Sequence, residues 1–131
     1  MLSQFTIENF ALIDRLSLEF CGQLNVLTGE TGAGKSIVID ALRFVLGDRF
    51  NSTQIRDAKL PCWVEAVFEL TKKHLHQQPI FCEYLASDET QIIIQRAYFP
   101  DGKNKIKVNG SSITVSQLKE IGNHLIDFHG A

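Results

Sequence analysis

Apolar and polar residues alternate along the start of the chain, and this pattern predicts two strands. Residues 2–9 alternate loosely, and residues 13–20 repeat the pattern with Leu16, Leu18 and Phe20 on one face. A period of two is typical of a strand that buries one face and exposes the other. We therefore expect two half-buried strands at the start of the fold.

A continuous apolar run and then a helical pattern follow these strands. Leu24–Thr28 has the length of a buried strand. Residues 36–46 carry apolar side chains at positions that fit a buried or amphipathic helix, and Gly47 fits its C-terminal end. The glycine-rich segment between them gives the order strand, loop, helix.

The second half of the chain predicts three further strands joined by tight turns. The strands are expected at Cys62–Leu70, Gln91–Phe99 and Asn104–Val108. Pro100-Asp101-Gly102 is a turn signal that makes the last two strands a hairpin. Asn109-Gly110 predicts a second tight turn directly after it.

Polar segments separate these strands. Residues 48–59 are polar and non-periodic, which predicts a surface loop. Residues 71–78 include His74 and His76 and predict a solvated linker, because no third metal-ligand candidate lies nearby in the sequence. Residues 79–85 predict a short helix.

The last helix is predicted from a capping pattern. Gln117 follows Thr114 by three residues, which is the spacing of a capping box. The apolar residues on one face of this helix are Val115, Leu118 and Ile121. We expect Gly122 to end the helix and residues 124–128 to begin a final strand.

Together these elements predict a mixed α/β or α+β fold. The chain has 131 residues, the size of one domain, and 44% of them are hydrophobic, which is enough for a core. Several antiparallel-type strands accompany the helix after the glycine-rich loop, which favours a mixed lobe over a doubly wound sheet. We expect residues 1–131 to form one domain.

Charge and cysteine content narrow the functional classes. The formal net charge is −2, so any DNA contact has to be local. Three cysteines without a C-x-x-C pair suit a reducing compartment. The sequence has no signal-peptide pattern and no apolar stretch of the ~20 residues that a membrane span needs. The expected location is therefore cytoplasmic, without a membrane partner.

The glycine-rich segment matches G-x-x-x-x-G-K-[ST], the phosphate-binding loop. Its residues are Gly29, Glu30, Thr31, Gly32, Ala33, Gly34, Lys35 and Ser36. Glycines let backbone N–H groups approach a phosphate chain closely, and the start of the following helix adds further N–H groups and a positive dipole end. We expect Lys35 to reach the β- and γ-phosphates of a nucleotide and the Ser36 hydroxyl to ligate Mg²⁺.

Nucleotide hydrolysis needs more than this loop. An acidic residue at the end of a buried strand has to position Mg²⁺ and water, and the nearest candidate, Asp127, follows too few apolar residues. Asp127 also begins a D-x-x-G sequence, but the N-K-x-D pattern of a GTPase fails after Asn104-Lys105. We expect no catalytic residue in this stretch and negligible hydrolysis by it alone.

Several phrases of the sequence resemble the SMC-like branch of the ABC-type ATPases, and most closely its bacterial members in DNA repair. Ile7-Glu8-Asn9-Phe10 is similar to the family's first strand, and residues 27–42 to its phosphate loop and helix. Ser52–Arg56 resembles an arginine loop, and residues 106–110 resemble a family hairpin. Residues 125–130 resemble a phrase that the family continues with a glutamine, which senses Mg²⁺ and the γ-phosphate. Because Ala131 stands at that position, the glutamine's role is not carried over.

The resemblance implies the N-terminal half of an ATPase head that binds ATP and Mg²⁺. It implies a homodimer in which two ATP molecules lie between the heads, and partners that include DNA and the chain's own C-terminal half-head. It further implies recombinational repair of DNA double-strand breaks in association with the nucleoid. A coiled-coil arm and the C-terminal half-head, with the signature motif and the catalytic acid, are then expected on chain that is not present here.

Two alternatives stay open from the residues. Another SMC-like or ABC-type ATPase would carry the same loop. A nucleoside or metabolite kinase would carry it too, but such kinases place the loop after the first strand, whereas two predicted strands precede it here.

Local basic residues are candidates for contacting DNA or a second head. Lys103, Lys105 and Lys107 recur at a spacing of two, so they should project from one face of the hairpin, with Ile106 on the other. Arg56 could add to this charge. The competing interpretation is a solvated strand face whose charges discourage edge pairing.

Overall fold

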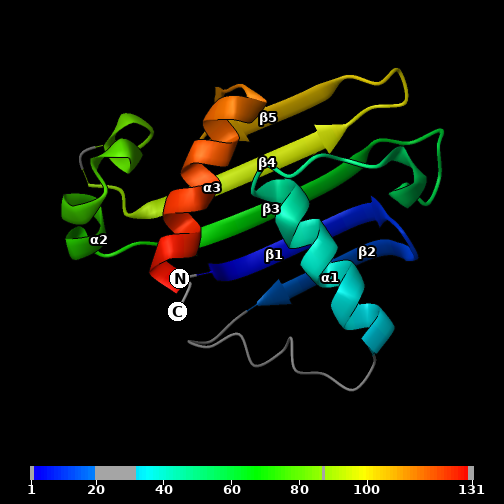
Figure 1. Ribbon diagram of the computed structural model, residues 1–131, viewed down its shortest axis with the longest axis horizontal. Coiled ribbons are helices and arrows are strands. Elements are labelled where there is room, and N and C mark those ends of the chain that lie inside the picture. Colours follow the sequence, from blue (N-terminus) through cyan, green and yellow to red (C-terminus); the bar gives the residue numbers. More distant parts are fainter. Residues whose placement is uncertain (1, 20–31, 87, 130–131) are drawn as a thin grey trace.

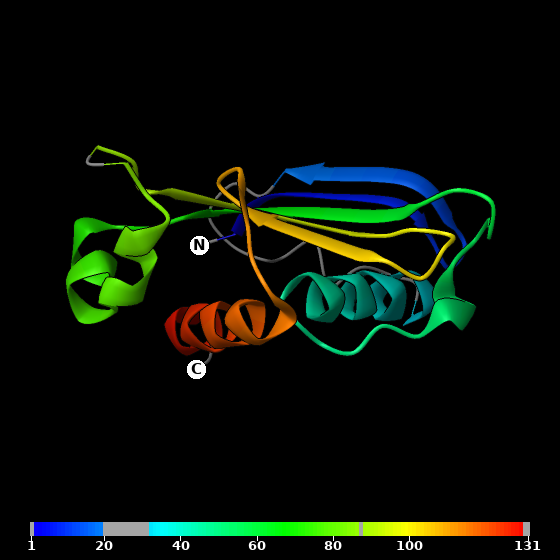
Figure 2. The ribbon, with the colours of Figure 1, turned by 90° about the horizontal axis from the view of Figure 1, so that it is seen from above.

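The fold is an antiparallel sheet with two helices packed on one face (Figures 1 and 2). The computed structural model describes residues 2–19, 32–86 and 88–129. In chain order the elements are β1 (Leu2–Phe10), β2 (Ile13–Glu19), α1 (Gly32–Val45), η2 (Ser52–Gln54), β3 (Cys62–Glu69), α2 (Lys72–Gln77), η3 (Pro79–Glu83), β4 (Gln91–Tyr98), β5 (Asn104–Val108), β6 (Ser111–Ser112) and α3 (Val115–His129). The expected mixed α/β class is confirmed.

The sheet has six strands in the order β2-β1-β3-β4-β5-β6, and every neighbouring pair is antiparallel. Most residues of β1, β4 and β5 alternate between an inner face toward the helices and an outer face toward solvent. Phe5, Val64 and Ile94 are buried on the inner face. In Figure 2 both α1 and α3 lie on this inner side. The predicted strands at residues 2–9, 13–20, 62–70, 91–99 and 104–108 are therefore confirmed to within a residue or two in the described part of the chain.

Helices α1 and α3 meet through two glycines. Gly47 ends α1 with φ +111°, and a Cβ added there would lie 2.9 Å from the Cα of Lys119. A Cβ added at Gly122 would collide with the carbonyl oxygen of Leu46 and would lie 3.1 Å from its carbonyl carbon. The end of α1 can thus approach the backbone of α3 only because both positions lack a side chain.

This contact corrects the prediction for the end of the chain. Gly122 does not end a helix, and residues 124–128 do not form a strand, because α3 runs unbroken to His129. Leu118, Ile121 and Leu125 are buried on one face of α3 at spacings of three and four residues. The expected capping box at its start is confirmed: the Thr114 N–H donates to the side chain of Gln117, and the Gln117 N–H donates to Thr114 Oγ1 at 3.1 Å.

The predicted solvated linker at residues 71–78 is also wrong, because α2 occupies it. Thr71 caps this helix by accepting a hydrogen bond from the His74 N–H at 3.1 Å, and the Thr71 N–H donates to His74 Nδ1 at 3.2 Å. Histidine here takes the place that Glu or Gln has in the usual capping box. The short helix expected at residues 79–85 is the 3-10 helix η3.

A tight turn with an asparagine follows β5. Asn109 has φ +49°, and its Oδ1 accepts a hydrogen bond from the Ile93 N–H at 2.7 Å. Its Nδ2 donates to the carbonyl oxygens of Gln91 at 3.0 Å and Tyr84 at 3.2 Å. The predicted turn at Asn109-Gly110 therefore also joins β5 to β4 and to the segment after η3.

The predicted strand at residues 24–28 lies outside the described residues. None of the helices in the described ranges combines the length and the apolar character that crossing a membrane requires.

Candidate functional site

The phosphate-loop sequence leads into the N-terminus of α1. Gly29, Glu30 and Thr31 lie outside the described residues, while Gly32–Ser36 form the beginning of this 14-residue helix. The first turn contains no acidic residue, and Ser36 is exposed. The first N–H groups of a helix have no partner within the helix and attract anions. The start of α1 therefore fits a phosphate group, and the exposed Ser36 hydroxyl fits an oxygen ligand for Mg²⁺.

Helix α1 is held in place along its buried side. Val38, Ala41, Phe44 and Val45 are buried against the sheet. This packing fixes the direction in which the N-terminal end of α1 points relative to the sheet. The buried residues are apolar residues of the helical pattern that the sequence shows.

The C-terminal end of α1 is held by Arg96, which the sequence analysis missed. Arg96 is 3% exposed, and its Nη1 donates to the carbonyl oxygens of Phe44 at 2.6 Å and Asp48 at 2.7 Å. Its guanidinium also lies 4.3 Å from the centre of the Phe44 ring. Burial lowers the pKa of Arg96 to about 10, so the side chain stays charged at neutral pH and matches the negative end of the helix dipole. A charged residue at an inward position of β4, after Ile92 and Ile94, is the sequence signal that could have identified it.

The arginine loop is tied to the end of β1 and to the start of β2. Asn9 is 6% exposed, and its Oδ1 accepts a hydrogen bond from the Asp57 N–H at 2.7 Å. Its Nδ2 lies within hydrogen-bond distance of the carbonyl oxygens of Asp57, Leu60 and Pro61, at 2.9, 3.0 and 3.2 Å. Arg56 is half-exposed, and its Nη1 lies 3.9 Å from Asp14 Oδ1. The conformation of the loop around Arg56 is thus set by Asn9 of the sequence Ile7-Glu8-Asn9-Phe10.

Two of the three lysines lie on the outer face of β5, as predicted, and the third directly precedes this strand. Lys105 and Lys107 are exposed on β5, while Ile106 between them is buried. Lys103 is exposed just before the strand, with its Nζ 3.9 Å from Asp101 Oδ2. No hydrogen bond or ion pair in the described part of the chain joins these lysines to Arg56, so the structure does not bring the two basic groups into direct contact.

Two other candidates from the sequence lie in helices. Asp127 belongs to α3 and not to the end of a strand, so its D-x-x-G sequence does not lie in the strand-end context that nucleotide hydrolysis requires. His74 accepts the capping hydrogen bond of α2, and desolvation together with the charge of Lys73 lowers its pKa. Within the described ranges no group of three or more His, Cys, Asp or Glu side chains could hold a metal ion.

The sequence model of one protein family, described as the RecF/RecN/SMC N-terminal domain, matches residues 1–127. The chain belongs to this family. The resemblance to SMC-like ATPases that the sequence phrases carry is thereby confirmed.

Family relatives include proteins named DNA repair protein RecN. That of Halalkalibacterium halodurans is 39% identical over 99% of this chain, and that of Bacillus subtilis is 38% identical over 99%. The chain spans 23% of the length of each of these relatives.

Solved structures share the fold. A structure from a study of ATP-driven dimerization and DNA-stimulated activation of SMC ATPases matches with a TM-score of 0.70 at 22% identity, covering 95% of this chain and 79% of that chain. The SMC head domain from Thermotoga maritima matches with a TM-score of 0.59 at 20% identity, over 92% of this chain and 41% of that one. The fold of this chain is therefore that of part of an SMC-type head.

Proposed function

We propose that this chain is the ATP-binding N-terminal part of the head of a RecN-like protein that acts in recombinational repair of DNA double-strand breaks. The observation that carries the proposal is the phosphate-loop sequence at the start of α1, in a chain of the RecF/RecN/SMC family. The relatives' name, DNA repair protein RecN, supports the role in repair.

In this proposal residues 29–36 bind the phosphates of ATP. The backbone N–H groups of the loop and of the first turn of α1 surround the phosphate oxygens, Lys35 contributes a positive charge, and Ser36 ligates Mg²⁺. Bound ATP and Mg²⁺ would lie between two heads, where their charged groups would contact both heads and hold them together. A homodimer with ATP between the heads agrees with the dimerization named for one structural neighbour.

DNA and a C-terminal half-head are the proposed partners. Lys103, Lys105, Lys107 and Arg56 are the proposed contacts with DNA or a second head, since all four lie on the surface of the described part of the chain. Cytoplasmic, nucleoid-associated localisation belongs to the same proposal. The family match favours an SMC-like ATPase over the kinase alternative, because the match covers residues 1–127 and not the phosphate loop alone.

Replacing Lys35 tests the nucleotide site. In the full-length protein that carries this sequence, Lys35→Ala should weaken ATP binding by about 10- to 150-fold. This range corresponds to the loss of one hydrogen bond from a charged group. Isothermal titration with ATP and Mg²⁺ measures the affinity, and the thermal midpoint without nucleotide checks the fold. Lys72→Ala removes an equal charge from exposed α2 and is the matched control. Equal ATP affinities for the two variants would refute the site.

A further inference from the structure

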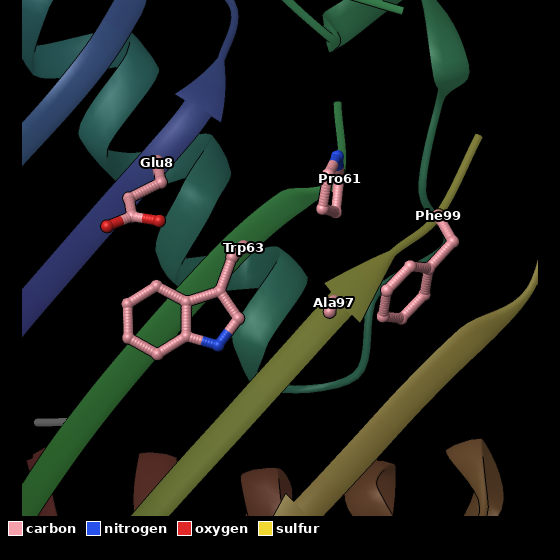
Figure 3. A pocket seen from close by; sticks show the side chains of 5 residues that line it. All are labelled: Glu8, Pro61, Trp63, Ala97 and Phe99. Atoms are coloured by element: carbon pink, nitrogen blue, oxygen red, sulfur yellow. The ribbon is translucent and has the colours of Figure 1, made fainter. Parts of the chain in front are cut away.

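The outer face of the sheet carries a groove between two aromatic side chains. Glu8, Pro61, Trp63, Ala97 and Phe99 line a hollow of about 300 Å³ (Figure 3). Trp63 of β3 is paired with Ala97 of β4, and Phe99 follows just after β4. In Figure 3 the small Ala97 side chain lies between the indole and phenyl rings, so it forms the floor of the groove.

The groove continues toward the lysines of β5. A second hollow of about 210 Å³ shares Trp63, Ala97 and Phe99 with the first and is also lined by Lys105 and Lys107. Ala97 is paired with Lys105 in the sheet register. The Lys105 Nζ lies 5.3 Å from the centre of the Phe99 ring. One aromatic surface therefore runs directly into a row of positive charges.

Two carboxylates that flank the aromatic pair on this face accept hydrogen bonds. Glu8 Oε1 accepts a hydrogen bond from Arg15 Nη1 at 2.6 Å. Glu65 Oε2 accepts one from Gln95 Nε2 at 2.6 Å. An ion pair offsets the charge of Glu8, and the lysines lie on the opposite side of the aromatic pair from Glu8, one strand beyond β4.

We propose that this groove binds an unpaired nucleotide of a DNA strand, with its base against Trp63 and Phe99 and its phosphates at Lys105 and Lys107. This inference rests on the proposed function and names the form of DNA that the site takes. Aromatic rings beside a positively charged track bind single strands by stacking, which tolerates any base sequence. Paired bases inside a duplex already stack on their neighbours, so they cannot enter between the two rings.

The same observations disfavour a protein segment as the occupant. An apolar docking site would exclude charge from its centre, whereas here two lysines line the groove and one lies over an aromatic ring. A single-stranded end next to a double-strand break would present the required combination of exposed base and phosphate.

Two truncations and one conservative change test the proposal in the full-length protein. Trp63→Ala and Phe99→Ala should each weaken binding of a single-stranded thymidine oligonucleotide by about 5- to 150-fold, the measured range for base stacking. Neither change should alter the affinity for a blunt duplex. Trp63→Phe keeps an aromatic ring and should retain most of the affinity. Ile93→Ala shortens an apolar side chain of β4 that does not line the groove, and it is the matched control.

Fluorescence gives an independent signal. Trp63 is the only tryptophan of this chain, and stacking of a base should quench its emission when the oligonucleotide binds. The difference in emission between the wild type and Trp63→Phe isolates this signal. Thermal midpoints of all variants verify that the sheet is intact.

Several results would overturn the proposal. Unchanged single-strand binding by both alanine variants would exclude stacking, and equal losses for single strand and duplex would show that the groove acts on phosphates or on the fold. If the variants altered only self-association in sedimentation, the groove would be a protein-docking surface. If the wild type bound neither form of DNA, the DNA part of the proposed function would fail as well, whereas ATP binding by Lys35 is tested separately.

Discussion

Replacement of Gly122 by alanine measures how closely α1 and α3 approach. Alanine favours a helix over glycine by about 1 kcal/mol, so at an uncrowded position the change would stabilise α3. Here the added Cβ would collide with the carbonyl oxygen of Leu46 and lie 3.2 Å from the Leu46 Cβ. Because the oxygen belongs to the backbone at the end of α1, it cannot rotate away.

The net cost follows from these two effects. Overpacking a buried contact costs up to about 3 kcal/mol, and the gain in helix propensity offsets about 1 kcal/mol of it. We expect Gly122→Ala to lower the free energy of unfolding by about 2 kcal/mol, which corresponds to about 6–10 °C in Tm for a chain of this size. Urea and thermal unfolding measure both quantities.

Two further variants separate a close contact from a helix stop. Asn123→Ala changes the exposed neighbour and should raise stability slightly through helix propensity alone. Asparagine tolerates the left-handed conformation of a helix stop, so Gly122→Asn would be mild if Gly122 ended the helix. In the continuous α3 it should destabilise at least as much as alanine. A stable Gly122→Asn variant, or a Gly122→Ala variant more stable than the wild type, would refute the packing of α1 on α3.

The remaining predictions concern Arg96 and the lysines. Arg96→Lys should lower the free energy of unfolding by about 1.5–3 kcal/mol, because one ammonium group cannot reproduce both bonds of the guanidinium to the end of α1. This loss, measured in urea, should be constant over the neutral pH range since the pKa of Arg96 is about 10, and an unchanged midpoint would contradict it. Substitution of Lys103, Lys105 and Lys107 by alanine should flatten the salt dependence of DNA binding by up to about three units. If alanine at Lys59, Lys72 and Lys73 flattened the salt dependence equally, the overall charge of the protein, and not a contact at the β5 lysines, would account for it.

The strands were predictable because the inner and outer faces of the sheet differ in polarity. In β5, inward Ile106 and Val108 alternate with outward Lys105 and Lys107, and the structure follows that period. Lys105 and Lys107 could be placed on the outer face for the same reason. Helix α1 was predicted from local sequence as well, although it begins at Gly32, within the glycine-rich sequence and not after it.

The errors arose where a local signal had a tertiary cause. Gly122 has the composition of a helix stop, but its lack of a side chain serves the contact with Leu46, which is distant in sequence. The groove of Trp63 and Phe99 depends on the register that places Ala97 between them. The partner of Arg96 is the end of α1, about fifty positions earlier. Such contacts join residues that are distant in sequence. They can be identified only from the three-dimensional structure, because no residue spacing within one segment predicts them.

The turn at Asn109 has a consequence for the chemical ageing of the protein. An asparagine before glycine is prone to deamidation, since the unhindered backbone nitrogen of the glycine can attack the side-chain amide. In the folded chain, hydrogen bonds to Ile93, Gln91 and Tyr84 hold that amide away from such an attack. Conversion to aspartate would remove both donated hydrogen bonds and introduce a charge. A chain that is deamidated while unfolded would therefore form the contacts between the Asn109 turn and β4 less well. The fraction of molecules with aspartate or isoaspartate at position 109 would therefore record how long the population has spent unfolded.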